Sequence, residues 1–356
     1  MILKGMIYYL TCVQLFFYLI IFIGLISLTT SAIIFIDVLK SSELNSLYLY
    51  FNRTLSVDQN NQFLSQPNPR VTGISRMLVI ILAGGLLFME KIVAQRFNKF
   101  IYLFTFLILF LCTFYIWGFQ SRMAFFGVIL IFFFLLLSKI NLKKKFMSII
   151  FFFIIPIFSF EILNYYKTNN YYEAKTAYQS FKREHDISKE NSEDKFIKNN
   201  RLLVEKENYT SSYITSGRSN LWSKSINYIF KSPIIGYGPQ ADRYLFKDAY
   251  FNINEHTKLY ESNSSNALIY SSLCAGVFGF VIILLIYLLV IKEILIKIIK
   301  NNIIRTGNIL TRLSFFTLIF LAFRSIVENS FMLFSLDFLL MLISYNILIY
   351  EKNKTT

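Results

Sequence analysis

The chain has 356 residues, of which 55% are hydrophobic and only 16% are charged. A water-soluble domain of this size cannot hold so much apolar surface in its interior, so the composition excludes a soluble globular protein and indicates a membrane protein. The net charge of +15 would suggest a nucleic-acid-binding protein, but the placement of the basic residues between apolar runs argues against that class.

Apolar runs of about twenty residues recur along the chain, and each can cross roughly 30 Å of hydrocarbon. Because the backbone cannot hydrogen-bond to lipid, such runs must be helical, and we predict an all-α polytopic transmembrane bundle of about eight spans. The predicted spans are 6–28, 77–93, 100–118, 123–138, 146–161, 265–291, 313–329 and 331–350. They divide the chain into helices 1–5 at 1–160, one large extracytoplasmic loop domain at 161–264, and helices 6–8 with a cytoplasmic tail at 265–356.

The first span and the cysteines each exclude one feature. Lys4 precedes an apolar stretch without a small-residue cleavage site, which predicts a retained span rather than a signal peptide. Cys12, Cys112 and Cys274 all lie inside apolar runs, so neither a disulfide framework nor a metal cluster with close ligand spacing is expected. The cysteines therefore give no indication of a metal site.

The basic residues follow the positive-inside rule. If Lys4 is cytoplasmic, the segments predicted to be cytoplasmic hold fifteen Lys or Arg residues and three acidic residues. The loop at 161–264 holds fifteen basic and thirteen acidic residues, and this near neutrality is typical of a translocated domain. Both termini are therefore predicted to be cytoplasmic, and nucleic acid is not an expected partner.

Arginine is concentrated toward the predicted outer side. Five of the six basic residues outside the cytoplasmic segments and the long loop are arginines, whereas the cytoplasmic segments contain twelve lysines and three arginines. A planar guanidinium grips phosphate or carboxylate in a bidentate way near low dielectric, so we interpret the outer side as an anion site. The five arginines are Arg53, Arg70, Arg76, Arg122 and Arg324.

Ionisable residues inside the predicted spans gather toward the same side. Arg76 and Arg122 begin the second and fourth spans, Arg324 and Glu328 lie in the outer half of the seventh, and Asp337 lies about two turns into the eighth. Such groups are costly at membrane depth, so their grouping predicts a functional site. The i, i+4 spacing of Arg324 and Glu328 also fits a structural ion pair.

The end of the long loop carries a Gly, Pro and aromatic pattern. Gly217-Arg218 followed by Trp222 predicts a helix start, and the segment Pro233-Ile-Ile-Gly-Tyr-Gly-Pro239 predicts a tight turn that docks on the membrane surface. His256 follows in the loop, where an isolated histidine can be a surface residue or a catalytic one.

Four motifs in this order carry a resemblance to a known family. They are Arg70-Val-Thr-Gly73 before a span, Gln120-Ser121-Arg122 before an apolar helix, Ser216-Gly217-Arg218 with Trp222 and the turn at 233–239, and Ser265-Asn266 followed by Gly276-Val-Phe-Gly279. Together with the large loop before the sixth helix, they resemble the O-antigen polymerase and ligase superfamily, the Wzy-like membrane glycosyltransferases of bacterial surface polysaccharides.

The resemblance implies an enzyme of the bacterial cytoplasmic (inner) membrane that moves a growing glycan from undecaprenyl pyrophosphate onto a lipid-linked repeat unit. It also implies that the transfer uses no nucleotide sugar, no metal and no other cofactor. Expected partners are the undecaprenyl-pyrophosphate-linked glycan and membrane lipid, and a chain-length regulator is a candidate partner. The expected substrate-binding residues are Arg70, Arg76, Arg122, Arg218, Asn266 and Arg324. The candidate bases, which remain alternatives, are Glu328, His256, Glu261 and Asp337.

Two other functions stay open at this point. Ligases of this superfamily typically carry a histidine immediately before the asparagine, and here that residue is Ser265, which favours a polymerase over a ligase. A transporter or flippase for the lipid-linked unit would have short loops throughout, whereas this chain places over a quarter of its length in one loop.

Overall fold

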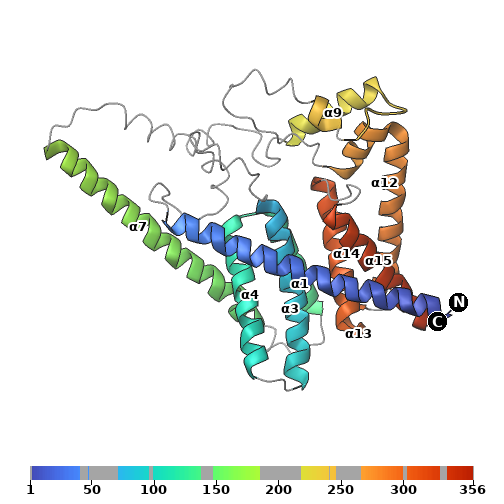
Figure 1. Cartoon of the computed structure of the whole chain (residues 1–356), viewed down its shortest axis with the longest axis horizontal. Helices are drawn as coiled ribbons and strands as arrows, with labels where there is room; N and C mark the ends of the chain where they lie inside the picture. The colour runs from blue at the N-terminus through green and yellow to red at the C-terminus, as the bar shows by residue number, and fades with distance from the viewer. Residues whose placement is uncertain are drawn as a thin grey trace. The chain divides into compact units, whose positions relative to one another are not determined.

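The structure is a computed structural model that describes residues 2–40, 47, 71–95, 99–137, 147–184, 218–239, 241–245, 266–299, 303–328 and 335–355. Every regular element in these ranges is helical, which confirms the predicted all-α class (Figure 1). The helices are α1 (Ile2–Lys40), α3 (Val71–Gln95), α4 (Lys99–Phe119), α5 (Arg122–Leu137), η3 (Ile150–Ile154), α7 (Ile155–Glu184), α9 (Arg218–Lys231), α10 (Ala241–Leu245), α12 (Ala267–Ile299), α13 (Ile303–Thr306), α14 (Ile309–Val327) and α15 (Leu336–Thr355).

Six of the described helices are long and apolar enough to cross a membrane, so the chain is an integral membrane protein. They are Leu10–Ile36 within α1, Gly73–Glu90 within α3, α4, Met147–Asn170 across η3 and α7, α12 and α14. The shorter apolar helices α5 and α15 coincide with the fourth and eighth predicted spans. The prediction of a polytopic helical bundle is therefore confirmed.

Two helices end well beyond the predicted spans. α1 continues to Lys40 and α7 to Glu184, whereas the corresponding spans were predicted to end at 28 and 161. The part of α7 after Asn170, where its membrane segment ends, is polar, with residues such as Glu173 and Lys175. The difference has a simple cause, because hydropathy marks the apolar part of a helix and not the point where the helical backbone stops.

The chain divides into two compact units. Unit 1 comprises 1–178, 293–320 and 340–356, and unit 2 comprises 179–292 and 321–339. Each is described by itself.

In unit 1, α3 packs against α1, α4 and α5, and glycines allow the close approach. A Cβ added to Gly85 would lie 2.6 Å from Cδ2 of Leu109 on α4, and one added to Gly127 of α5 would lie 2.5 Å from Cγ1 of Val79 on α3. Small residues at such crossings let helix backbones come together in a membrane, where packing replaces the hydrophobic effect as the source of association.

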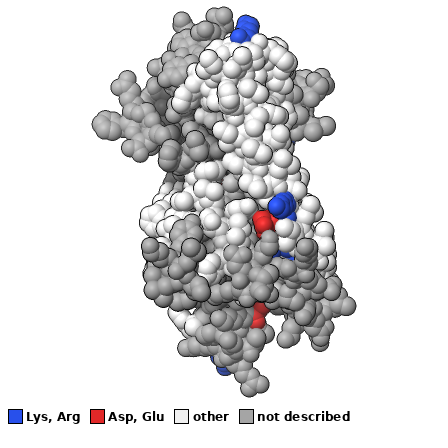
Figure 2. Space-filling model, turned by 90° about the vertical axis from the view of Figure 1, so that its right-hand side faces the viewer, with Lys and Arg blue, Asp and Glu red and all other residues white. Residues whose placement is uncertain are grey.

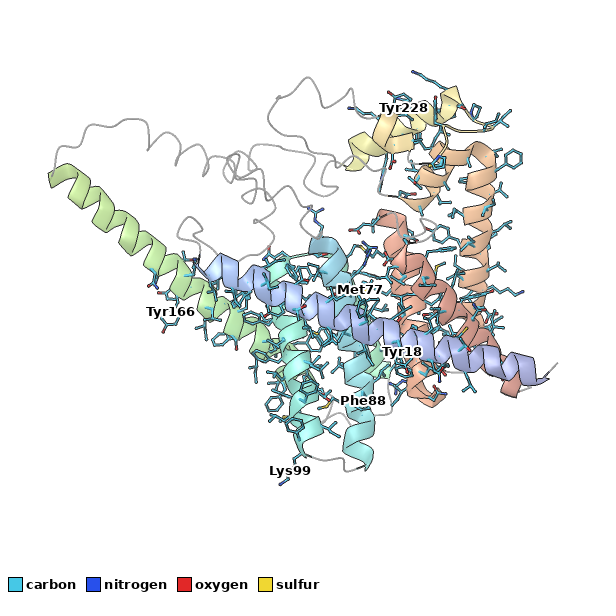
Figure 3. All side chains as sticks on the ribbon, viewed as in Figure 1. Tyr18, Met77, Phe88, Lys99, Tyr166 and Tyr228 are labelled. Carbon is cyan, nitrogen blue, oxygen red and sulfur yellow. The ribbon has the colours of Figure 1, made fainter. Side chains whose placement is uncertain are left out.

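Large apolar side chains cover much of the outside of the membrane helices. Tyr18 of α1 and Tyr166 of α7 are exposed and point away from their helices (Figure 3). On the face that Figure 2 draws, few charged side chains of the described residues reach the surface. Such surfaces are those expected of helices whose solvent is lipid.

In unit 2, α12 is broken near its start. Ala275 (φ −133°, ψ 18°) and Gly276 (φ 59°, ψ −143°) leave the helical conformation. A Cβ added to Gly279 would collide with the carbonyl of Ser271, although residues eight positions apart lie about 12 Å apart along a straight helix. The chain therefore doubles back at the break.

The turn at 232–239 docks its backbone on this break. The N–H groups of Tyr237 and Gly238 donate to the carbonyls of Leu273 and Cys274, each at 2.9 Å, and the N–H of Val277 donates to the Pro233 carbonyl at 2.8 Å. These are carbonyl and N–H groups that the break deprives of helical partners. The docking satisfies them without water, as backbone near the membrane interior requires.

Candidate functional site

A buried ion cluster joins α14 to α15 in unit 2. Arg324 donates from Nη1 to Oδ2 of Asp337 and from Nη2 to Oε2 of Glu328. The side chains of Arg324 and Asp337 are 4% and 2% exposed, and that of Glu328 is 13% exposed. Two carboxylates bind one guanidinium, and Glu328 is the most accessible of the three groups.

The local sequence explains where these three groups lie. Arg324 and Glu328 are one helical turn apart at the end of α14 and therefore meet. Asp337 lies in the first turn of α15, where the helix dipole favours a negative charge. Ser335 caps that helix, since its hydroxyl oxygen accepts the N–H of Phe338 at 3.2 Å.

Asn266 lies beside the cluster and ties α12 to α14. Its side-chain oxygen accepts the N–H of Ile269 at 3.1 Å, which caps the start of α12. Its Nδ2 donates to the Ile326 carbonyl at 2.6 Å, between Arg324 and Glu328 in sequence. Asn266, predicted to bind substrate, thus has both a donor and an acceptor engaged within the protein.

A second contact reinforces this junction. The hydroxyls of Tyr287 on α12 and Ser325 on α14 lie 2.6 Å apart and are buried. Ser325 also donates to the Ala322 carbonyl at 2.5 Å, so Tyr287 is the donor in the hydroxyl pair. The sequence analysis did not identify this pair, because two hydroxyls inside apolar runs carry no pattern of their own.

Unit 1 holds the predicted residues Arg76 and Arg122. Arg76 lies in the second turn of α3 and Arg122 is the first residue of α5, where it is exposed. The turn before Arg122 is unusual, because Gln120 has a φ of 47°, a left-handed conformation that non-glycine residues seldom adopt. The buried Ser121 follows, and its carbonyl accepts the N–H of Phe125 at 3.0 Å.

Trp117 contacts this turn and the helices next to it, a role that the sequence analysis missed. Its Nε1 donates to Oε1 of Glu161 on α7 at 2.6 Å, and its ring makes an edge contact with Phe125 on α5 at 5.6 Å between centroids. Its carbonyl accepts the N–H of Gln120 at 3.2 Å. A tryptophan just before a Gln-Ser-Arg step was the one available signal, but its partner is more than forty residues away.

The structure does not describe the side chains of the remaining predicted residues. Arg70, His256 and Glu261 lie outside the described residues, as does Ser265. Arg218 begins α9, but its side chain is outside what the structure describes. The structure thus brings together four of the predicted residues, which are Asn266, Arg324, Glu328 and Asp337.

Comparison with known proteins identifies a family. A family model described as O-antigen ligase matches residues 104–284, slightly more than half of the chain. Searches of curated proteins and of solved structures give no match. The matched stretch contains Arg122, α9, the turn at 232–239 and the break in α12, and it ends before Arg324. The chain belongs to the O-antigen ligase family.

Proposed function

We propose that this protein is a polysaccharide polymerase of the O-antigen or capsule type. It transfers the growing glycan from undecaprenyl pyrophosphate onto the sugar hydroxyl of a lipid-linked repeat unit. The observation that carries the proposal is the hydrogen bond from Asn266, inside the family match, to the Ile326 carbonyl on α14, the helix that also carries Arg324 and Glu328 of the ion cluster. The carboxylates of this cluster lie near a residue of the family match, and a carboxylate can act as the base that a glycosyl transfer needs.

The proposed reaction is a single displacement. The acceptor hydroxyl oxygen attacks the anomeric carbon of the donor glycan, a new glycosidic C–O bond forms, and the C–O bond to pyrophosphate breaks. The hydroxyl proton passes to a carboxylate, and undecaprenyl pyrophosphate leaves with the bonding electron pair. Arginines stabilise the charge that develops on the leaving group.

Among the candidate bases we favour Glu328. It is more accessible than Asp337, which is 2% exposed. Arg324 already donates to both carboxylates, so we assign it to holding Glu328 in place rather than to binding pyrophosphate. Arg122 and Arg218 remain the proposed pyrophosphate ligands, because guanidinium groups bind phosphate in a bidentate way.

The arginine assignment is tested in cells that make a polymerase-dependent glycan. Arg122→Ala should abolish the ladder of long chains while the protein stays in the membrane, and Arg122→Lys should restore little, because an ammonium replaces a planar fork by a point charge. A normal ladder from Arg122→Ala at normal expression would remove Arg122 from the site.

A ligase is the second candidate, because the matching family model is described as O-antigen ligase. Ser265 stands where ligases of the superfamily typically have histidine, and this favours the polymerase. The two differ in a deletion strain with one such polymerase. Loss of a polymerase should leave a single repeat unit on its acceptor, whereas loss of a ligase should leave the acceptor bare.

We propose the bacterial cytoplasmic membrane as the location, with both termini inside and the long loop outside, on the basis of the charge asymmetry. In a cysteine-free background, cysteines replacing Ser192 and Asn254 should react with an impermeant reagent added to intact cells. Cysteines replacing Lys144 and Lys300 should react only after permeabilisation. Protection of the Ser192 position in intact cells would overturn this orientation.

A further inference from the structure

An exposed apolar surface runs along α9 and the turn at 232–239 of unit 2. It consists of Ile226, Phe230, Ile234 and Ile235, which we call the α9 surface. Phe230, Ile234 and Ile235 are 76%, 62% and 77% exposed, whereas Ser225 on the same helix is fully buried. Apolar side chains gathered in this way mark a surface that a partner covers.

The α9 surface is fixed to a membrane helix. The turn that carries Ile234 and Ile235 is bound through three backbone hydrogen bonds to the break in α12. Gly276 and the Pro233 and Ile234 carbonyls are in such close contact that a Cβ at Gly276 would collide with them. The depth of the break in the bilayer therefore sets the depth of Ile234 and Ile235.

The length of α12 places the break at the edge of the hydrocarbon. Between the break and Lys292, the first charged residue that follows, the uncharged helix is the fifteen-residue run Val277–Ile291. At 1.5 Å per residue this run covers about 22 Å, less than the roughly 30 Å of a bilayer core. Even if the Lys292 side chain extends outward to reach water, the break lies no further out than the hydrocarbon boundary.

The outer surface of that run is already lipid-facing. Phe278, Ile282, Leu285 and Leu288 are all exposed, and no charged residue lies between them in the sequence. The α9 surface continues this apolar surface beyond the break through the docked turn.

Basic and aromatic residues surround the α9 surface. The segment 218–239 contains Arg218, Lys224 and Lys231 and no acidic residue. Lys224 and Lys231 are exposed, and Nζ of Lys231 lies 5.4 Å from the ring centroid of Tyr228 on α9 (Figure 3). Lysines and aromatic rings flanking an apolar stripe are the composition of helices that lie in the headgroup region.

We propose that α9 and its turn form a bilayer-embedded anchor, in which Phe230, Ile234 and Ile235 insert among lipid acyl chains and Lys224 and Lys231 face headgroup phosphates. The partner is bulk membrane lipid. The proposal stands on α12 as a membrane span and is independent of the reaction proposed above. Its consequence is that membrane lipid holds the loop segment that carries Arg218 at the bilayer surface.

Tryptophan fluorescence in bilayers tests the anchor directly, because the chain has only two tryptophans. With Trp117 and Trp222 replaced by Phe, single tryptophans are introduced as Phe230→Trp and Ile235→Trp. Both positions are exposed, so the larger ring disturbs no packing. Lys224→Trp, on the polar side of α9, is the matched control.

The full-length variants are reconstituted into phosphatidylethanolamine and phosphatidylglycerol vesicles with bromine on the acyl chains. We expect bromine to quench the tryptophans at 230 and 235 several-fold more than the one at 224, with emission at shorter wavelength. Aqueous iodide should quench in the reverse order. Tryptophans at 230 and 235 that bromolipid does not quench would overturn the proposal, whether water or protein shields them.

Discussion

Two arginines on the same helix, α14, differ in the carboxylates that they bind. In unit 1, Arg312 donates to both oxygens of Glu90 on α3, at 2.5 and 3.2 Å, so one cation meets one anion. In unit 2, Arg324 serves two carboxylates, Glu328 and Asp337. The Arg312 pair links α14 to α3, whereas Arg324 holds two carboxylates, one of which, Glu328, is the base that we propose. The difference supports a structural role for the first and a catalytic one for the second.

The largest effect is expected from removing the carboxylate of Glu328. Glu328→Gln keeps the shape of the side chain but removes the proposed base, so polymer formation per molecule of protein should fall by about 10²- to 10⁴-fold. The rate is measured on purified protein with lipid-linked repeat units.

Glu90→Gln is the matched control for that experiment. It neutralises a carboxylate that also binds an arginine of α14, and it should lower thermal stability while leaving the rate per folded molecule nearly unchanged. Equal losses of rate from the two variants would remove the distinction between the pair and the cluster.

Removing each of the two arginines should lower the free energy of unfolding by a different amount. Arg324→Leu removes the cation from the buried Asp337 and the part-buried Glu328, and breaking a buried pair in this way costs about 3–5 kcal/mol. Arg312→Leu should cost less, because its partner Glu90 is more accessible to water than Asp337. Unfolding in detergent measures both.

Two further variants give that prediction a check. Adding Glu328→Gln and Asp337→Asn to Arg324→Leu should recover much of the lost stability, since both carboxylates that Arg324 binds are then neutral. If Arg312→Leu lowered the free energy of unfolding more than Arg324→Leu does, this account of the cluster would be wrong.

The next comparison is between two glycines in the backbone of unit 2. Gly276→Ala puts a side chain at φ 59° and against the carbonyls of Pro233 and Ile234, and should cost at least about 1–3 kcal/mol. Gly238→Ala is the control, since φ there is 87° but, apart from its chain neighbours, no atom of the described residues lies within 4 Å of an added Cβ. It carries the conformational cost alone and should be milder, as thermal unfolding would measure. Equal costs would mean that docking at the break contributes nothing.

The smallest effect is expected in unit 1. Glu161→Leu removes the acceptor of the Trp117 hydrogen bond, worth about 1 kcal/mol, and should lower polymer formation a few-fold through the turn that carries Arg122. Glu161→Gln keeps an acceptor oxygen, so its activity should stay close to that of the unchanged protein. If Gln and Leu behave alike in the polymerisation assay, the hydrogen bond does not position the turn.

Much of the helical layout could be predicted from the sequence, because a membrane helix must be both long and apolar. The pairing of Arg324 with Glu328 followed from their spacing on one helix. Asp337 could be placed in the same region but not in contact with Arg324, since it lies on another helix. Contacts between helices depend on how the helices pack, which hydropathy does not encode.

Other features carried a signal whose meaning needed the structure. An asparagine directly before an apolar run is a favoured helix cap, and Asn266 is one, although we predicted a substrate ligand. The two glycines of Gly276-Val-Phe-Gly279 lie inside a continuous apolar run, so hydropathy gave no sign of the break in α12. The turn at 233–239 was correctly marked as a turn, but its three bonds to that break depend on tertiary structure.

The central proposal is that this protein joins lipid-linked repeat units to one another. The most direct test is to place the purified protein in liposomes with undecaprenyl-pyrophosphate-linked repeat units as the sole glycan, and to analyse the lipid-linked products by gel electrophoresis. We predict products of two and more repeats that remain on the pyrophosphate carrier, and none with Glu328→Gln. Absence of elongation, with transfer of glycan only when a separate acceptor lipid is added, would contradict the polymerase and indicate a ligase.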